Sequence, residues 1–196
     1  LVNADAEADA QFALRLPVAN PADGQLELLA GLRKGRLASA YRYVPWHSAG
    51  DNTLAWLKRS LVAGDIEQAT FLHVGPLRGG ANGGRLDMQF KLKNATLDYL
   101  PGWPALSGLD AIVDISGRAL KVRGERGRIM SAQASRLVAD IPNLTKAILS
   151  IDADLAIDLA DVDKLLAESP LRAHSAAVAK RLDLSGPAQA HLALSV

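Results

Sequence analysis

The chain has 196 residues, of which 49% are hydrophobic, 22% charged and only 5% aromatic. A mean hydropathy of +0.08 excludes intrinsic disorder, because disordered chains lack large aliphatic residues. Lys and Arg total 22 against 21 Asp and Glu, so the net charge of +1 gives no sign of a nucleic-acid partner. The absence of cysteine excludes disulfide scaffolds, cysteine nucleophiles and Cys-based metal sites.

Alternation of apolar and polar residues with period two dominates the chain. From Val2 to Leu16 every even position is apolar, and Asn3, Asp5 and Glu7 are among the polar residues at odd positions. Successive side chains of a strand point to opposite faces, so this pattern predicts a long strand with one dry face. The same alternation recurs in residues 85–93, 109–116, 120–123, 149–159 and 188–196. We therefore expect a mainly β fold of long amphipathic antiparallel strands.

Clusters of Gly, Asn, Asp and Pro predict the connections between these strands. Such clusters occupy residues 20–24, 31–35, 79–84 and 124–127. No linker, low-complexity tract or shift in charge divides the chain, so we treat residues 1–196 as a single unit. The chain begins at Leu1 without an initiator Met or a signal peptide, and we expect it to be a segment of a longer protein.

Two short helical regions interrupt the strands. The first has Asp51 as N-cap, Leu54, Leu57 and Leu61 at helical spacing, and Gly64 as the residue that ends it. The second extends from about residue 161 to 181 and breaks near Pro170. No apolar run approaches the roughly 20 residues that a membrane-spanning helix needs.

Residues 10–16 and 188–194 have similar sequences. The similarity is explained either by equivalent positions in a long internal repeat or by chance resemblance between two amphipathic strands.

A sheet with one apolar face must cover that face. Two short helices are too few, which leaves a second packed sheet, a closed barrel, or a curled groove that holds a foreign apolar molecule. The inward positions carry Leu, Val, Ile and Ala, with few aromatic rings to fill a sandwich.

The sequence offers no catalytic constellation. His47, His73, His174 and His191 are too far apart for a helical zinc motif. Neither a nucleophile elbow nor a phosphate-binding loop is present. Asp residues 152, 154 and 158 lack the spacing of a calcium loop, and a solvated strand face explains them. We therefore predict no catalytic residue, no metal and no cofactor.

Two clusters, residues 41–46 and 99–104, hold most of the Trp and Tyr residues. They fit either a rim that contacts a membrane or partner, or a rigid corner that packs a loop against the sheet, which we favour.

The run from Asn94 to Ala111 contains Ala95-Thr96-Leu97 followed by Pro101-Gly102-Trp103-Pro104 and Leu109-Asp110-Ala111. This run resembles a signature of the YhdP family, large AsmA-like proteins of Gram-negative bacteria. A helix-to-strand segment at residues 56–72 and the segment at residues 138–144 also resemble this family. The resemblance as a whole is strongest between residues 41 and 144.

The resemblance implies an inner-membrane-anchored protein that extends through the periplasm. Its strands would curl into an open β-taco-like groove that carries phospholipid acyl chains between the inner and outer membranes, without enzymatic activity. The side chains expected to line this groove are Leu86, Met88, Phe90, Leu92, Leu97, Val113, Ile115, Leu149, Ile151, Leu155 and Ile157. The alternatives are a structural or scaffolding module of envelope assembly with a self-buried core, and a periplasmic hydrolase with a site spread over loops.

Overall fold

The computed structural model describes residues 2–20, 23–43, 51–77, 83–146, 148–162, 164 and 185–195. It forms a single nine-stranded sheet in which every strand pairs antiparallel with its neighbour in sequence. The strands are β1 (Ala6–Arg15), β2 (Gln25–Arg36), β3 (Leu61–Pro76), β4 (Arg85–Leu97), β5 (Leu106–Ser116), β6 (Ala119–Ile129), β7 (Ala132–Ile141), β8 (Ser150–Asp158) and β9 (Pro187–Ser195).

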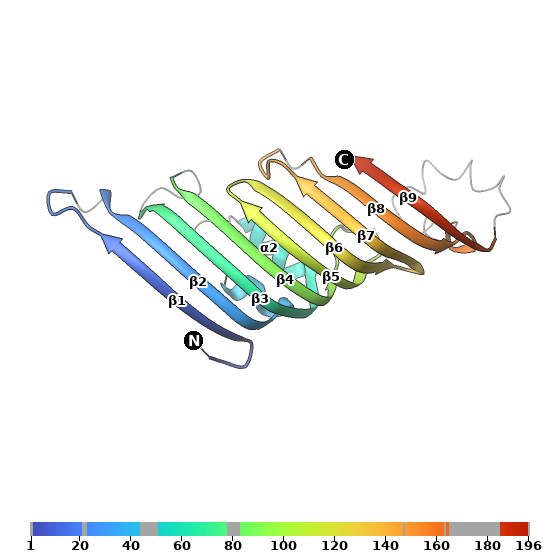
Figure 1. Ribbon diagram of the computed structural model, residues 1–196, viewed down its shortest axis with the longest axis horizontal. Coiled ribbons are helices and arrows are strands. Elements are labelled where there is room, and N and C mark those ends of the chain that lie inside the picture. The colour runs from blue at the N-terminus through green and yellow to red at the C-terminus, as the bar shows by residue number, and fades with distance from the viewer. Residues whose placement is uncertain are drawn as a thin grey trace.

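The sheet is open, with β1 and β9 at its two ends (Figure 1). Nine strands at the usual spacing give a row about 38 Å long. The strands are also long, from 9 residues in β8 to 16 in β3, against a usual length of about 5–6. The predicted mainly β fold with open antiparallel strands is therefore confirmed.

Two helices connect β2 to β3, the 3-10 helix η2 (Leu37–Tyr43) and the α-helix α2 (Asp51–Ser60). In Figure 1 they lie behind β3 to β5, at one end of these strands. Leu37 of η2 packs into a core cluster with Ile66, Leu92 and Leu109. The helices therefore cover part of one sheet face.

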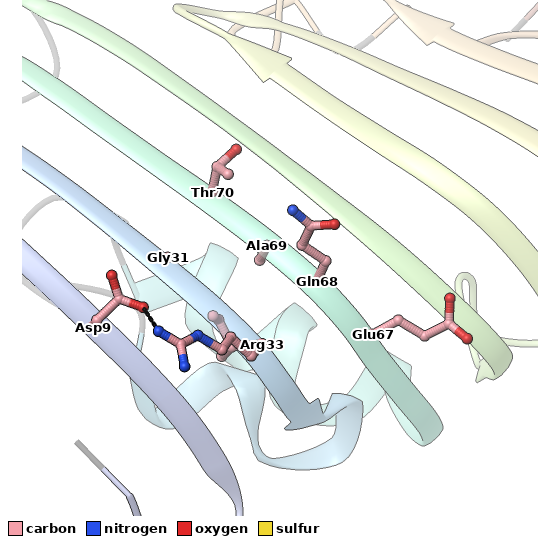
Figure 2. Close-up of a pocket in the computed structure, with 8 residues that line it drawn as sticks. Asp9, Gly31, Arg33, Glu67, Gln68, Ala69 and Thr70 are labelled. Carbon is pink, nitrogen blue, oxygen red and sulfur yellow. Dashed lines mark hydrogen bonds and ion pairs between the residues drawn. The ribbon is translucent and has the colours of Figure 1, made fainter.

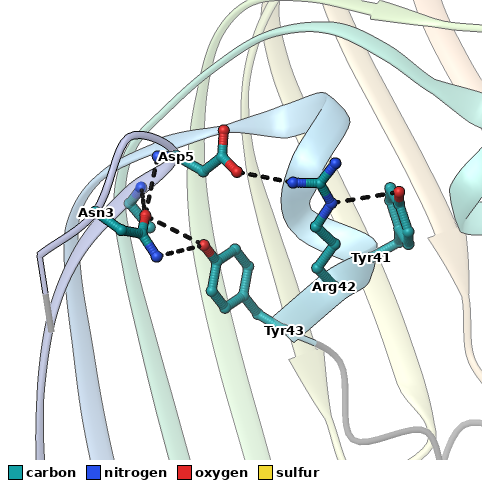
Figure 3. A network of polar contacts seen from close by, with 6 residues as sticks. Asn3, Asp5, Tyr41, Arg42 and Tyr43 are labelled. Atoms are coloured by element: carbon teal, nitrogen blue, oxygen red, sulfur yellow. Dashed lines mark hydrogen bonds and ion pairs between the residues drawn. The ribbon is translucent and has the colours of Figure 1, made fainter.

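Polar contacts hold η2 against the start of the chain (Figure 3). The Arg42 guanidinium donates to Asp5 Oδ2 at 2.9 Å. Asn3 Nδ2 donates to the Tyr43 hydroxyl at 3.1 Å. The ribbons in Figure 3 arch over η2, so the strands curl toward the face that the helix covers.

Two of the predicted turns are wrong, because their glycines lie inside strands. Residues 31–35 belong to β2, and residues 124–127 belong to β6. A Cβ atom on Gly124 would lie 3.2 Å from both Leu109 Cδ1 and Leu137 Cβ. Glycine at this position makes room for neighbouring side chains on the apolar face and does not reverse the chain.

The first predicted helix is confirmed over Asp51–Ser60, but its predicted end is wrong. Leu61 and Gly64 belong to β3, and Gly64 has a φ of +114° within that strand. The second predicted helix lies mostly outside the described residues. The part of this region that is described, residues 160–162 and 164, is helical.

Candidate functional site

One face of the sheet is apolar across all nine strands. Strand pairing aligns one residue of each strand into a row in which each is the register partner of the next. We call this the apolar row, and it consists of Ala8, Leu32, Ala69, Phe90, Val113, Val122, Ala139, Ile151 and Leu194.

The adjacent row points to the opposite face, since neighbouring residues of a strand alternate. We call it the polar row, and it consists of Asp9, Gly31, Thr70, Gln89, Asp114, Lys121, Asp140, Ser150 and Ser195. Each face of the sheet therefore keeps its own character from one edge strand to the other, apolar on one side and polar on the other.

The predicted lining residues share the apolar face. Met88 pairs with Ile115, Phe90 with Val113, and Leu97 with the buried Leu106. Ile151, Leu155 and Ile157 face Leu194, Ala190 and Ala188 of β9. Leu92 is part of the buried core, Leu86 pairs with His73, and Leu149 directly precedes β8.

Sequence reasoning left some residues of this face out of the predicted lining. Leu26 and Leu28 of β2 pair with Leu14 and Phe12 of β1. Both alternate with the polar Gln25 and Glu27, and this alternation could have placed them on the apolar face. In β7, Leu137, Ala139 and Ile141 join the same face. His73 also falls on it, between Leu28 and Leu86.

Burial divides the apolar face into two regions, which we call the covered end and the open end. At the covered end, in the core cluster that includes Leu37 of η2, Leu109 is 1% exposed and Ala95 is fully buried. Toward the opposite strand ends Met88, Ile115 and Ile151 are half-buried. On the edge strands Phe12 is 73% exposed and Leu194 is 36% exposed.

The tyrosine and tryptophan clusters contribute to the covered end. Trp56 Nε1 of α2 donates to the Tyr99 carbonyl oxygen at 3.0 Å, and the Tyr99 ring packs against the core. Burial raises the pKa of the Tyr99 hydroxyl. This contact ties the 98–105 loop to the helix, as the rigid-corner interpretation predicts; Trp46 lies outside the described residues.

The polar face carries cross-strand ion pairs. Lys91 Nζ lies 2.9 Å from Glu67 Oε2, and Arg123 Nη2 lies 2.7 Å from Asp114 Oδ2. A shallow depression of about 380 Å³ lies beside Gly31, Thr70 and the Asp9–Arg33 ion pair (Figure 2). Polar and apolar atoms line it equally, and exposed ion pairs of this kind contribute at most about 1 kcal/mol each. The polar face is therefore the side of the sheet that contacts water.

A four-residue cluster joins the polar sides of β7, β8 and β9. Arg136 contacts both Asp152 and Asp154, at 2.8 Å each. His191 places Nδ1 2.9 Å from Asp154 Oδ1 and Nε2 3.2 Å from Asp152 Oδ2. The hydrogen bond to Asp154 raises the pKa of His191, and the hydrogen bonds from Arg136 and His191 lower the pKa of Asp154 to about 2.

Within the described ranges, no group of three or more His, Cys, Asp or Glu residues is arranged to hold a metal ion. No helix in that part of the chain is both long enough and apolar enough to cross a membrane.

The described geometry defines a class of protein, an open amphipathic β-sheet with a long apolar face that its own helices cover only in part. The sequence model of the YhdP protein family matches residues 1–196, and the chain belongs to this family. The Escherichia coli K12 protein described as "Intermembrane phospholipid transporter YhdP" is 30% identical over 176 residues, which make up 87% of this chain. The chain spans 14% of the length of that relative. No solved structure matches it significantly.

Proposed function

We propose that the apolar face binds phospholipid acyl chains, and that in the full-length protein it forms part of a hydrophobic groove between the inner and outer membranes. The observation that carries this proposal is the apolar row, which runs without a polar interruption from β1 to β9. A family relative is a phospholipid transporter by its description. The protein would act in the periplasm as part of an inner-membrane-anchored chain that serves outer-membrane biogenesis.

The physical basis of this proposal is that the helices cover less of the sheet than its apolar face presents. The helices bury only the covered end, while Phe12, Leu14 and Leu194 remain more than a third exposed. Between the edge strands that carry these residues, Met88, Ile115 and Ile151 are half-buried, and exposed apolar side chains that share one face mark an interaction site. Acyl chains fit such a face because it offers Leu, Ile, Val and Ala without polar anchors, and tight small-molecule sites need such anchors.

Transport along this face would be diffusive and non-enzymatic. Acyl chains would remain against the apolar row while headgroups remained in water. Each position would bind weakly, because tight binding at any one position would stop the movement of lipid. No cofactor is needed, and phospholipid is the partner that the face accommodates.

The covered end favours a second candidate, a structural module of envelope assembly whose apolar face is buried by protein. The cluster of Leu37, Ile66, Leu92 and Leu109 is an ordinary protein core. Under this candidate, protein from elsewhere in the full-length chain would bury the open end in the same way.

Site-specific photocrosslinking in the full-length protein separates the two candidates. A photoreactive residue at Phe90, Val113 or Ile151 of the apolar row should capture phospholipid in cells. The matched controls are Gln89, Asp114 and Ser150 of the polar row, one residue away, which should capture none. Equal capture on both faces, or capture of protein alone at the apolar row, would contradict lipid binding.

A further inference from the structure

Irregular strand pairing is concentrated within the covered end, beside its buried residues Ile66, Ala95 and Leu109. The β3–β4 pair contains three register shifts, and the β4–β5 and β5–β6 pairs contain two each. The β6–β7 and β8–β9 pairs are regular. The extra residue of a β-bulge bends its strand and increases its twist. The shifts on β3 to β6 therefore mark a line along which the sheet can turn.

Three residues with positive φ lie along this line on adjacent strands. They are Gly64 at +114°, Asn94 at +49° and Gly108 at +59°. A Cβ atom on Gly64 would lie 2.6 Å from Ala95 Cα and 2.9 Å from the Asn94 carbonyl oxygen. The bulges of β3 and β4 are therefore in direct backbone contact, which only glycine permits at this position.

Asp110 joins the bulged strands from the polar side. Its Oδ1 accepts the Asn94 backbone N–H at 2.8 Å. Its Oδ2 accepts from Lys93 Nζ at 2.7 Å and from Arg126 Nε at 2.6 Å. The residue is 6% exposed, and these hydrogen bonds hold the pKa of its carboxyl group well below the ordinary value. One carboxylate thus connects β4, β5 and β6 at the bend.

The residues directly opposite this carboxylate form the covered core. Leu109 and Ala111, its neighbours in β5, are 1% and 4% exposed. Asp110 is therefore on the outer side of a corner whose inner side belongs to the core cluster that includes Leu37 of η2.

We propose that Asp110 is a positioning residue that fixes this bend, and that the bend determines how much of the apolar face stays open to lipid. The claim that Asp110 fixes the bend is independent of the proposed function, whereas the claim about access of lipid rests on it. Loss of the bend would separate the core from its cover and extend the accessible apolar face toward Leu109. The bend itself is testable without lipid.

The first test measures access to the covered core in the full-length protein, with any cysteines outside this chain replaced. Ala111→Cys introduces a thiol at a buried position, and labelling by a water-soluble maleimide reports its exposure. Asp110→Asn should raise the labelling rate at least about tenfold, since a charged carboxylate with three donors loses its charge. Asp114→Asn is the matched control. It removes a charge from the same strand and polar face, where Asp114 pairs with Arg123, and it should leave Ala111→Cys protected.

The second test locates lipid. A photoreactive residue at Ile115 should capture phospholipid in both the unmodified and the Asp110→Asn protein. A photoreactive residue at Leu106, which is buried at the covered end, should gain capture only with Asp110→Asn. Absence of capture at Ile115 in the unmodified protein would overturn the proposed lipid binding, whereas an unchanged maleimide rate would overturn the bend alone.

A milder variant keeps the proposal testable if Asp110→Asn prevents accumulation of the protein. Arg126→Gln removes one charged donor and retains Asn94 N–H and Lys93. It should give a labelling rate between those of the unmodified protein and a fully open core. Protection equal to that of the unmodified protein would contradict the role of Asp110.

Discussion

The covered and open ends of the apolar face are built from the same residue types but differ in what they contact. At the covered end Leu109 of β5 is 1% exposed, beneath a cluster that includes Leu37 of η2. Six residues further along β5, Ile115 is half-buried, with Met88 and Leu120 as its strand partners. The difference shows that alternation makes a face apolar, while neighbouring elements decide whether that face is a core or a surface.

The largest effect should come from a charge at the covered end. Leu109→Asp would bury a carboxylate without a partner, at a cost of several kcal/mol, comparable with the whole stability of a domain. We expect loss of the folded protein, seen as disappearance of the cooperative thermal transition and of the protein from cell extracts. Accumulation at normal levels with an unchanged transition would show that the covered end is wet.

The same charge at the open end should spare the fold. Ile115→Asp keeps its carboxylate hydrated when lipid is absent, so the free energy of unfolding should fall by only about 1–2 kcal/mol. An acyl chain cannot pass the charge without desolvating it, so delivery of phospholipid to the outer membrane should stop although the protein accumulates. Unimpaired delivery by the folded variant would argue against a lipid path here, and collapse of the fold would favour the self-buried module.

Glycine replacements should separate the two regions on a smaller scale. Gly124→Ala places a methyl group 3.2 Å from Leu109 Cδ1 and Leu137 Cβ, and overpacking of this kind costs about 1–3 kcal/mol. Gly117→Ala, in the β5–β6 turn at the open end, has no neighbour within 4 Å but a φ of +56°, which costs about 1 kcal/mol.

Thermal unfolding of these two variants under identical conditions provides the measurement. Only Gly124→Ala should also expose the core to the maleimide in the Ala111→Cys background. Equal behaviour of both variants would mean that the covered end is not tightly packed.

The smallest effect concerns pH at the polar face. The pKa of His191 is raised from 6.5 in the folded state, so its stabilising contribution is complete below about pH 6.5 and is lost as pH rises through the folded value. The pKa of Asp154 is lowered from 3.8 to about 2, so its contribution is present above about pH 4 and is lost as pH falls toward 2. The stabilisation should therefore be greatest between about pH 4 and 6.5.

The difference in thermal midpoint between the unmodified protein and His191→Gln, followed across pH, isolates this contribution. The difference should shrink above pH 6.5 and be small throughout, because the cluster is solvent-exposed. A difference that grew with rising pH would contradict the assigned sign.

Local sequence was sufficient for most of the strands and for the polarity of their faces. Alternation in residues 85–93, 109–116 and 149–159 correctly predicted β4, β5 and β8, because a period of two is a property of the extended backbone itself. The predicted turns at residues 31–35 and 124–127 were wrong for a complementary reason. Glycine is compatible with both a turn and a crowded strand, and only the partners Leu109 and Leu137 decide between them at Gly124.

The sequence by itself determined that this protein would form long amphipathic strands with one apolar face, and residues 94–111 indicated its family. Tertiary structure alone decided which part of that face is covered. Leu61 continues the helical spacing in the sequence and Gly64 occupies the position where a helix would end, yet both belong to β3, in which Leu61 pairs with Leu97 of β4. Asp110 alternates like any surface aspartate, but bulges on three strands surround it with donors from β4 and β6. Long-range pairing sets these contacts, and no local pattern encodes a partner that lies 16 residues away.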